Sequence, residues 1–181
     1  MIAIIAEKPS VGLDIARVVG ADTRNDGYCS GNGYMVTWAL GHLVSLAMPD
    51  TYGYTKTAAE DLPMLPEPFR LVSRQVRTDR GMVTDIAASK QLKVIESVFN
   101  RCDSIIVATD AGREGELIFR WIYDFLGCTK PFRRLWISSL TDEAIRKGLE
   151  ELKDGSEYDS LYAAADSRAK ADWLVGMNAS R

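Results

Sequence analysis

Short, uniformly apolar runs alternate with amphipathic segments along the chain. The runs IAIIA at 2–6 and SIIVAT at 104–109 are typical of strands buried on both faces of a sheet. Hydrophobic positions spaced three and four residues apart predict a helix over 114–126 and a last helix from about 157 to about 176. Strands that alternate with helices predict an α/β fold with a parallel sheet covered on both faces.

Local signals mark the ends and turns of further elements. Pro9 suits the first turn of a helix that follows the first strand. Residues 28–40 read as a hairpin, because Asn32-Gly33 supplies the positive φ angles of a tight turn. Thr141 is a suitable cap for another helix. The remaining predictions are a helix at 90–99, a strand at 132–138 and an irregular, proline-rich insertion at 43–70.

Composition narrows the class of protein only slightly. The chain has 181 residues, enough for one domain with a sizeable core, and its net charge of −3 does not indicate a nucleic-acid-binding protein. Three widely spaced cysteines and one histidine make a zinc site improbable and are compatible with reduced thiols in a cytosolic protein. No run of residues has the length of a membrane span or the features of a signal peptide.

Carboxylates gather where the sequence predicts that strands end. In ATDAGREGE, Asp110 ends one apolar run and Glu114 begins a helix, while Glu7 ends the first run. If the two strands are neighbours, the three carboxylates converge at the carboxyl edge of the sheet, where sites form in such folds. Carboxylates that converge repel one another unless a cation neutralises them, and hard oxygen ligands suit Mg²⁺. Lys8 and Arg113 add positive charge of the kind that phosphoryl chemistry uses.

The same residues also have a purely structural interpretation. A glutamate in the first turn of a helix is favourable because it faces the helix dipole. Asp110 could serve as the helix cap and Gly112 as part of a tight turn. Spacing alone leaves both interpretations open.

The motifs, taken together, resemble a known family. EKPS after the first strand and TDAGREGE after a later one look like the Toprim domain shared by topoisomerases, bacterial primases and some nucleases. GHLVSL, LPMLP, RLWISSLT and ADWLVGMNASR are similar to the N-terminal part of the bacterial topoisomerase III group of type IA DNA topoisomerases. The resemblance implies a Rossmann-like parallel sheet flanked by helices, with a β-hairpin and an irregular proline-rich insertion.

A mechanism comes with this resemblance. Type IA enzymes cleave one DNA strand through a tyrosine, hold it as a 5′-phosphotyrosyl intermediate and religate it with Mg²⁺. By resemblance, Glu7 assists proton transfer at the leaving 3′-oxygen and also binds metal, and Lys8 stabilises charge on the scissile phosphate. Asp110 and Glu114 hold Mg²⁺, with Arg113 as a local charge partner.

The resemblance also implies a set of DNA contacts. Arg168 and Asp172 lie in the last helix, where an ion pair between positions i and i+4 is the alternative interpretation. Core packing is the alternative for Trp173. The complete set of expected DNA-binding residues is His42, Lys56, Arg113, Arg168, Asp172, Trp173 and Arg181.

Two departures from the family pattern shape the expectations. Many members carry a second aspartate where this chain has Gly112, so one Mg²⁺ is favoured over two. None of the seven tyrosines precedes a proline, as the nucleophile of the family does. We therefore expect residues 1–156 to be a Toprim catalytic domain and residues 157–181 to lead into a further DNA-binding domain. We expect this stretch alone to be inactive and monomeric.

The expected partners are single-stranded DNA and the remaining domains of the same enzyme, in a cytoplasmic, nucleoid-associated protein that does not bind membranes. Two other classes stay open. One is a Mg²⁺-dependent Toprim nuclease or primase-like enzyme, against which the ADWLVGMNASR segment argues. The other is a non-catalytic single-strand-binding module, which Gly112 favours.

Overall fold

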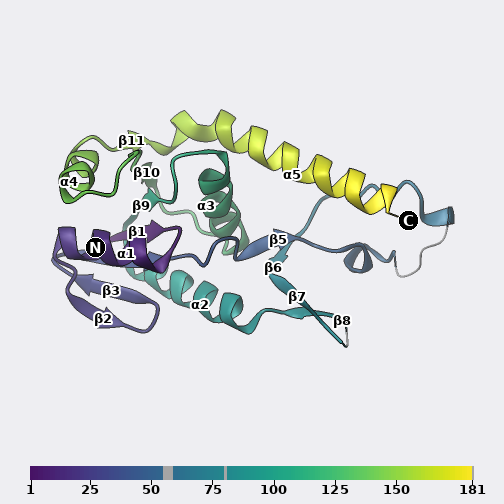
Figure 1. The fold of residues 1–181 in the computed structure, drawn as a ribbon, viewed down its shortest axis with the longest axis horizontal. Helices are drawn as coiled ribbons and strands as arrows, with labels where there is room; N and C mark the ends of the chain where they lie inside the picture. Colours follow the sequence, from purple (N-terminus) through teal and green to yellow (C-terminus); the bar gives the residue numbers. More distant parts are fainter. Residues whose placement is uncertain (55–58, 80, 181) are drawn as a thin grey trace.

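The protein is built around one mixed sheet of seven strands. The structure, a computed structural model, describes residues 1–54, 59–79 and 81–180 (Figure 1). The strand order is β11-β10-β9-β1-β4-β3-β2, and two further two-stranded sheets pair β5 with β6 and β7 with β8. The strands are β1 (Ile2–Ala6), β2 (Thr23–Asn25), β3 (Tyr28–Gly31), β4 (Tyr34–Trp38), β5 (Val44–Leu46), β6 (Leu71–Ser73), β7 (Gln75–Thr78), β8 (Gly81–Thr84), β9 (Ser104–Ala108), β10 (Phe132–Arg134) and β11 (Lys153–Asp154).

Helices cover both faces of this sheet, as predicted for the α/β class. Alternate residues of β1 belong to two separate cores: Ala3 and Ile5 pack with α2 and α3, whereas Ile4 and Ala6 pack with α1 and α4. A strand buried on both faces must be apolar throughout, which explains its uniform composition. The helices are α1 (Pro9–Val19), α2 (Ile86–Arg101), α3 (Arg113–Phe125), α4 (Asp142–Glu150) and α5 (Asp159–Ala179).

The two central strands, β1 and β9, are parallel neighbours in register. Ile2 pairs with Ser104 and Ala6 with Ala108, so both strands end at the same edge of the sheet. The residues that follow them, Glu7 and Thr109, therefore start their loops side by side. This adjacency is the condition on which the predicted convergence of carboxylates depended.

The tight turn predicted for the β3–β4 hairpin is confirmed. Asn32 and Gly33 both have positive φ angles, 50° and 82°, as a two-residue turn of this hand requires. The Asn32 side-chain amide also donates a hydrogen bond of 2.8 Å to the carbonyl of Val19. The turn is thereby attached to the end of α1.

The insertion at 43–70 is largely irregular, with short 3₁₀ helices at Pro49–Tyr52 and Ala59–Asp61. Strand β5 near its start pairs with β6, which directly follows its end, and the insertion packs against α5. The Trp173 indole donates to the carbonyl of Ala47 at 3.0 Å, and the Asn178 side chain exchanges two hydrogen bonds with the backbone of Met64. The insertion thus supports the last helix.

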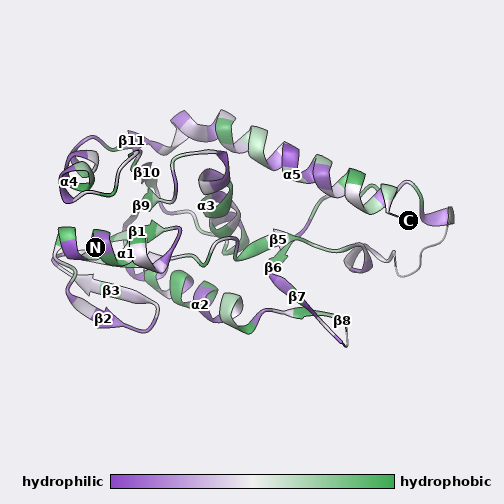
Figure 2. Cartoon of the chain, viewed as in Figure 1, coloured by the Kyte–Doolittle hydropathy of each residue, from purple (hydrophilic) through white to green (hydrophobic). Residues whose placement is uncertain are grey.

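Two features were not anticipated from the sequence. The β7–β8 hairpin extends away from the central sheet, and α5 runs along one side of the molecule (Figure 1). Hydrophilic and hydrophobic residues alternate along the whole of α5 (Figure 2), and Ala165 and Trp173 are its buried residues. This helix begins and ends two to three residues later than predicted, because a 3₁₀ turn at Gly155–Tyr158 precedes it. Within the described residues no helix is both long and apolar enough to cross a membrane.

Candidate functional site at the carboxyl edge of the sheet

Glu7 and Asp110 meet at the end of the central strand pair. The backbone N–H of Asp110 donates a hydrogen bond of 3.0 Å to Oε2 of Glu7, although 103 residues separate them. The side chain of Asp110 remains exposed beside this contact, and Glu7 is half-buried. The Glu7 carboxylate is therefore brought to the backbone of Asp110, which follows from the adjacency of the two strands.

Asp110 is not the cap of the helix that follows. The N-cap of α3 is Gly112, whose φ of 170° is ordinary extended backbone, and within the described chain no side chain caps this end. The structural interpretation of Asp110 as a cap is therefore wrong. Its carboxylate is left available at the mouth of the sheet.

Glu114, in the first turn of α3, has a partner that the sequence did not suggest. Its Oε2 lies 3.0 Å from Nε2 of His42, whose ring packs edge-on against Trp121 with 6.3 Å between ring centroids. In the part of the chain that the structure describes, no three Asp, Glu, His or Cys residues are gathered closely enough to hold a metal ion. Glu114 is thus directed towards His42 and does not complete a cluster with Glu7 and Asp110.

All three carboxylates nevertheless line the same pocket, of about 590 Å³. Helix α5 closes its other side with Arg168 and Asp172, whose charged groups lie 3.9 Å apart and are both well exposed. The pocket combines oxygen donors that suit Mg²⁺ with two arginines, Arg113 and Arg168, that suit a phosphate. The carboxylate oxygens of Glu7, Asp110 and Glu114 are ligands that suit Mg²⁺. For all three to bind one ion, the Glu114 carboxylate must exchange its contact with His42 for the ion.

The other predicted site residues are placed differently. Lys8 is exposed at the N-cap of α1, next to Glu7 in the chain. Trp173 is 7% exposed and packs edge-on against Tyr52 and Phe69, so its ring serves the core beneath the insertion. Lys56 and Arg181 lie outside the described residues.

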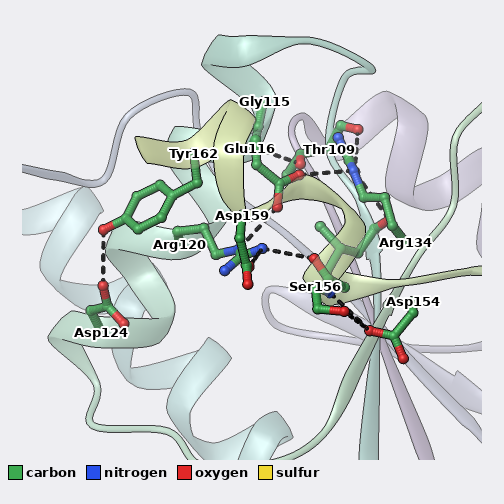
Figure 3. Close-up of polar contacts among 12 residues, drawn as sticks. Thr109, Gly115, Glu116, Arg120, Asp124, Arg134, Asp154, Ser156, Asp159 and Tyr162 are labelled. Carbon is green, nitrogen blue, oxygen red and sulfur yellow. Dashed lines mark hydrogen bonds and ion pairs between the residues drawn. The ribbon is translucent and has the colours of Figure 1, made fainter. Parts of the chain in front are cut away.

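The sequence did not indicate a buried ion-pair network formed by Glu116, Arg120 and Arg134. Glu116 and Arg134 are each 1% exposed, and Glu116 lies between Arg134 and Arg120 (Figure 3). Nε of Arg120 donates to Oε1 of Glu116 at 2.9 Å, and Nε of Arg134 lies 3.1 Å from Oε2. Burial lowers the pKa of Arg134, and the negative charge of Glu116 opposes that effect. The only sequence signal was Glu116 itself, an acidic residue on the apolar face of α3.

Comparison with known proteins identifies the fold. Residues 2–140 match the family described as Toprim domain. The chain belongs to the Toprim domain family. A solved structure of full-length topoisomerase I from Thermotoga maritima superposes on 96% of this chain and 24% of that chain, with a TM-score of 0.60. At 19% identity this likeness shows a shared fold.

Closely similar sequences come from proteins named DNA topoisomerase 3. Those of Shouchella clausii (strain KSM-K16), Bacillus thuringiensis (strain Al Hakam) and Bacillus subtilis (strain 168) are 50%, 52% and 48% identical, over 98–99% of this chain. The chain spans 24% of the length of each of these relatives. The resemblance expected from the motifs is confirmed.

Proposed function

We propose that this chain is the Toprim domain of a type IA DNA topoisomerase, whose carboxylates act with Mg²⁺ on the phosphates of a single DNA strand. The observation that carries the proposal is the contact between Glu7 and the Asp110 backbone, in a pocket that Arg168 and Glu114 also line. The high identity to proteins named DNA topoisomerase 3 supports it. The enzyme would work in the cytoplasm on chromosomal or plasmid DNA.

The proposed role of each residue comes from the family resemblance, and its place in the structure is compatible with that role. Glu7, half-buried and hydrogen-bonded, is suited to move a proton at the 3′-oxygen that leaves on cleavage and returns on religation. Exposed Lys8 would stabilise charge on the scissile phosphate. Asp110 and Glu114 would hold one Mg²⁺, and Arg113 and Arg168 would bind neighbouring phosphates. When bound, the ion supplies positive charge that orders the phosphates for religation.

The nucleophile would come from elsewhere in the enzyme. None of the seven tyrosines here precedes a proline, as the family's nucleophile does. We infer that residues 1–156 form the Toprim catalytic domain and that residues 157–181, mostly α5, connect it to a DNA-binding domain. The 181-residue chain is then expected to be a monomer that binds single strands without cleaving them.

The metal site can be tested by thermal unfolding of the 181-residue chain with Asp110→Asn. At ten times its dissociation constant, Mg²⁺ should stabilise the wild type by about 1.4 kcal/mol. That gain corresponds to a shift in Tm of about 3–6 °C for a domain of this size. Asp110→Asn should remove most of the shift, and should raise Tm without metal because it relieves repulsion from Glu7.

Asp14→Asn is the matched control, because Asp14 lies on α1 and lines a different pocket. It should leave the Mg²⁺ shift intact. If neither millimolar Mg²⁺ alone nor Mg²⁺ with a short single strand changes the Tm of the wild type, the proposed metal site is refuted. A shift that appears only with the strand would mean that a DNA phosphate completes the site.

A second candidate is a single-strand-binding module without catalysis. The observation that favours it is the pairing of Glu114 with His42, which leaves two carboxylates together in place of three. In that case the affinity for a short single strand should be the same with and without Mg²⁺.

A further inference from the structure

Arg134, the last residue of β10, donates hydrogen bonds to the backbone of the loop that carries Asp110. Its Nη1 donates to the carbonyls of Val107 and Thr109, at 3.1 and 2.8 Å, and its Nη2 donates to the carbonyl of Asp110 at 2.7 Å. The three acceptors are the end of β9 and the first residues beyond it. The Val107 carbonyl also accepts from the backbone N–H of Leu135 at 2.9 Å. The Thr109 and Asp110 carbonyls lie beyond the strand, and buried carbonyls need donors, which Arg134 supplies here.

Helix α3 also packs against the Asp110 carbonyl. A Cβ atom at Gly115 would lie 1.9 Å from the carbonyl oxygen of Asp110, so the first turn of the helix packs directly on that oxygen. The hydroxyl of Thr109 donates to the carbonyl of Gly115 at 2.7 Å. The Asp110 carbonyl therefore contacts both the Arg134 guanidinium and helix α3. The backbone N–H of Asp110 donates to Glu7.

The charge of Arg134 is difficult to explain by stability alone. Removing a guanidinium and a carboxylate from water is costly, and apolar residues of similar size often stabilise a core as well or better. The contact between Nε of Arg134 and Oε2 of Glu116 has ion-pair distance but lacks hydrogen-bond geometry. The good hydrogen bonds of Arg134 all go to the three backbone carbonyls.

We propose that Arg134 is a positioning residue, which fixes the Thr109–Asp110 backbone so that the Asp110 carboxylate stands beside Glu7, ready for cation and phosphate. Its rigid planar fork holds three carbonyls in a fixed geometry, whereas the ammonium of lysine is a compact point charge on a flexible stem. Groups that orient a metal-binding side chain commonly change metal affinity 10- to 100-fold when they are altered. The part of this proposal that concerns the cation rests on the proposed function.

Arg120 provides a matched control within the same network. It also binds Glu116, and its other hydrogen bonds reach the carbonyl of Gly155 and the carboxylate of Asp159. None of these groups belongs to the Asp110 loop. Loss of Arg120 therefore disturbs the Glu116 network and the start of α5 but spares the three carbonyls.

The experiment compares Arg134→Lys with Arg120→Lys in the 181-residue chain. Backbone order parameters from ¹⁵N relaxation are measured without metal for residues 109–114, and Mg²⁺ affinity is measured by calorimetry, with the short single strand present if the wild type requires it. Arg134→Lys should lower the order parameters of this loop from about 0.85 towards 0.6. It should also weaken Mg²⁺ binding by roughly tenfold or more. Arg120→Lys should change neither quantity, even where it lowers Tm.

The two readouts separate failure of this proposal from failure of the proposed function. If the wild type binds no Mg²⁺ in either condition, the metal site fails, and the metal-free order parameters still decide whether Arg134 fixes the loop. An Arg134→Lys loop as rigid as the wild type overturns the positioning role. Equal effects of the two variants on loop order, or on Mg²⁺ affinity, also overturn it, since they would reflect general stability.

A wild-type measurement covers the case in which Arg134→Lys does not fold. The Nη protons of Arg134 should exchange slowly with water, because buried carbonyls hold them, and their resonances should shift on addition of Mg²⁺ more than those of Arg120. Fast exchange would overturn the proposal, and so would a shift no larger than that of Arg120 under conditions where the wild type binds Mg²⁺.

Discussion

At the residue scale, two glycines at the start of α3 have opposite requirements. A Cβ at Gly115 would meet the Asp110 carbonyl at 1.9 Å, a contact that no side-chain rotation relieves. A Cβ added at Gly112 would have no described atom within 4 Å apart from its chain neighbours, and the φ angle there is 170°. Gly115 is therefore fixed by packing against the candidate site, whereas Gly112 is open to substitution.

The same replacement at both positions tests this difference. Gly115→Ser should destabilise the fold by about 1–3 kcal/mol, because the helix and the loop must move apart. Gly112→Ser should be neutral or slightly stabilising, since serine is a favourable helix cap. Urea unfolding of the two variants measures both effects. Equal stability of the two would show that α3 does not press on the Asp110 carbonyl.

At the element scale, the N-terminus of α2 is connected to the loop that presents His42. Asp85 caps α2 by accepting hydrogen bonds from the N–H groups of Ala87 and Ala88, and its other oxygen pairs with Arg74 at 2.6 Å. Arg74 in turn donates to the carbonyls of Leu40 and His42. One carboxylate thereby fixes a helix start and, through an arginine, the partner of Glu114.

This arrangement predicts a dependence of stability on pH. The hydrogen bond from Arg74, followed by that from the Ala88 backbone, lowers the pKa of Asp85 below its value of 3.8 in an unfolded chain. A lowered pKa means that the stabilising contribution is complete above about pH 5 and is lost as the pH falls below about 4. Asp85→Asn keeps the cap but loses the charge. Its stability deficit relative to wild type, measured by urea unfolding, should shrink between pH 5 and 3. A deficit that stays constant over this range would contradict the assignment.

At the scale of the whole molecule, the net charge opposes DNA binding. The net charge is −3, so the chain should bind a short single strand weakly and with strong salt dependence. Arg168 lines the candidate pocket and has one weak ion pair. If it contacts a phosphate, Arg168→Ala should reduce the slope of log K against log salt concentration by about 0.7. Fluorescence anisotropy with a labelled oligonucleotide measures this slope.

Arg17→Ala is the control for the salt experiment. Arg17 lies on α1, where two hydrogen bonds of 2.7 and 2.8 Å pair it with Asp142 of α4. Its removal lowers the net charge by the same amount but leaves the pocket unchanged. A slope that falls equally in both variants would indicate a nonspecific effect of charge and would count against Arg168 as a DNA contact.

The sequence alone determined the main elements of the central sheet and the region of the candidate site. Uniform apolar runs predicted the two central strands, Asn32-Gly33 predicted the hairpin turn, and Thr141 caps its helix as expected, by accepting from the N–H of Ala144. These features depend on residues close together in the chain, whose periodicity and backbone preferences are local. The position of Glu7 and Asp110 followed from the same information once parallel strands were assumed.

Only the tertiary structure decided which distant polar groups meet. The partner of Glu114 lies 72 residues away, and Arg134 reaches carbonyls 24 to 27 residues before it. An arginine in a short strand predicts solvent exposure, yet strand order places Arg134 over the end of β9, where three backbone carbonyls and Glu116 compensate its burial. Trp173 is likewise covered because the insertion folds back onto α5. Such contacts depend on how strands and helices are arranged in space, which local periodicity does not encode.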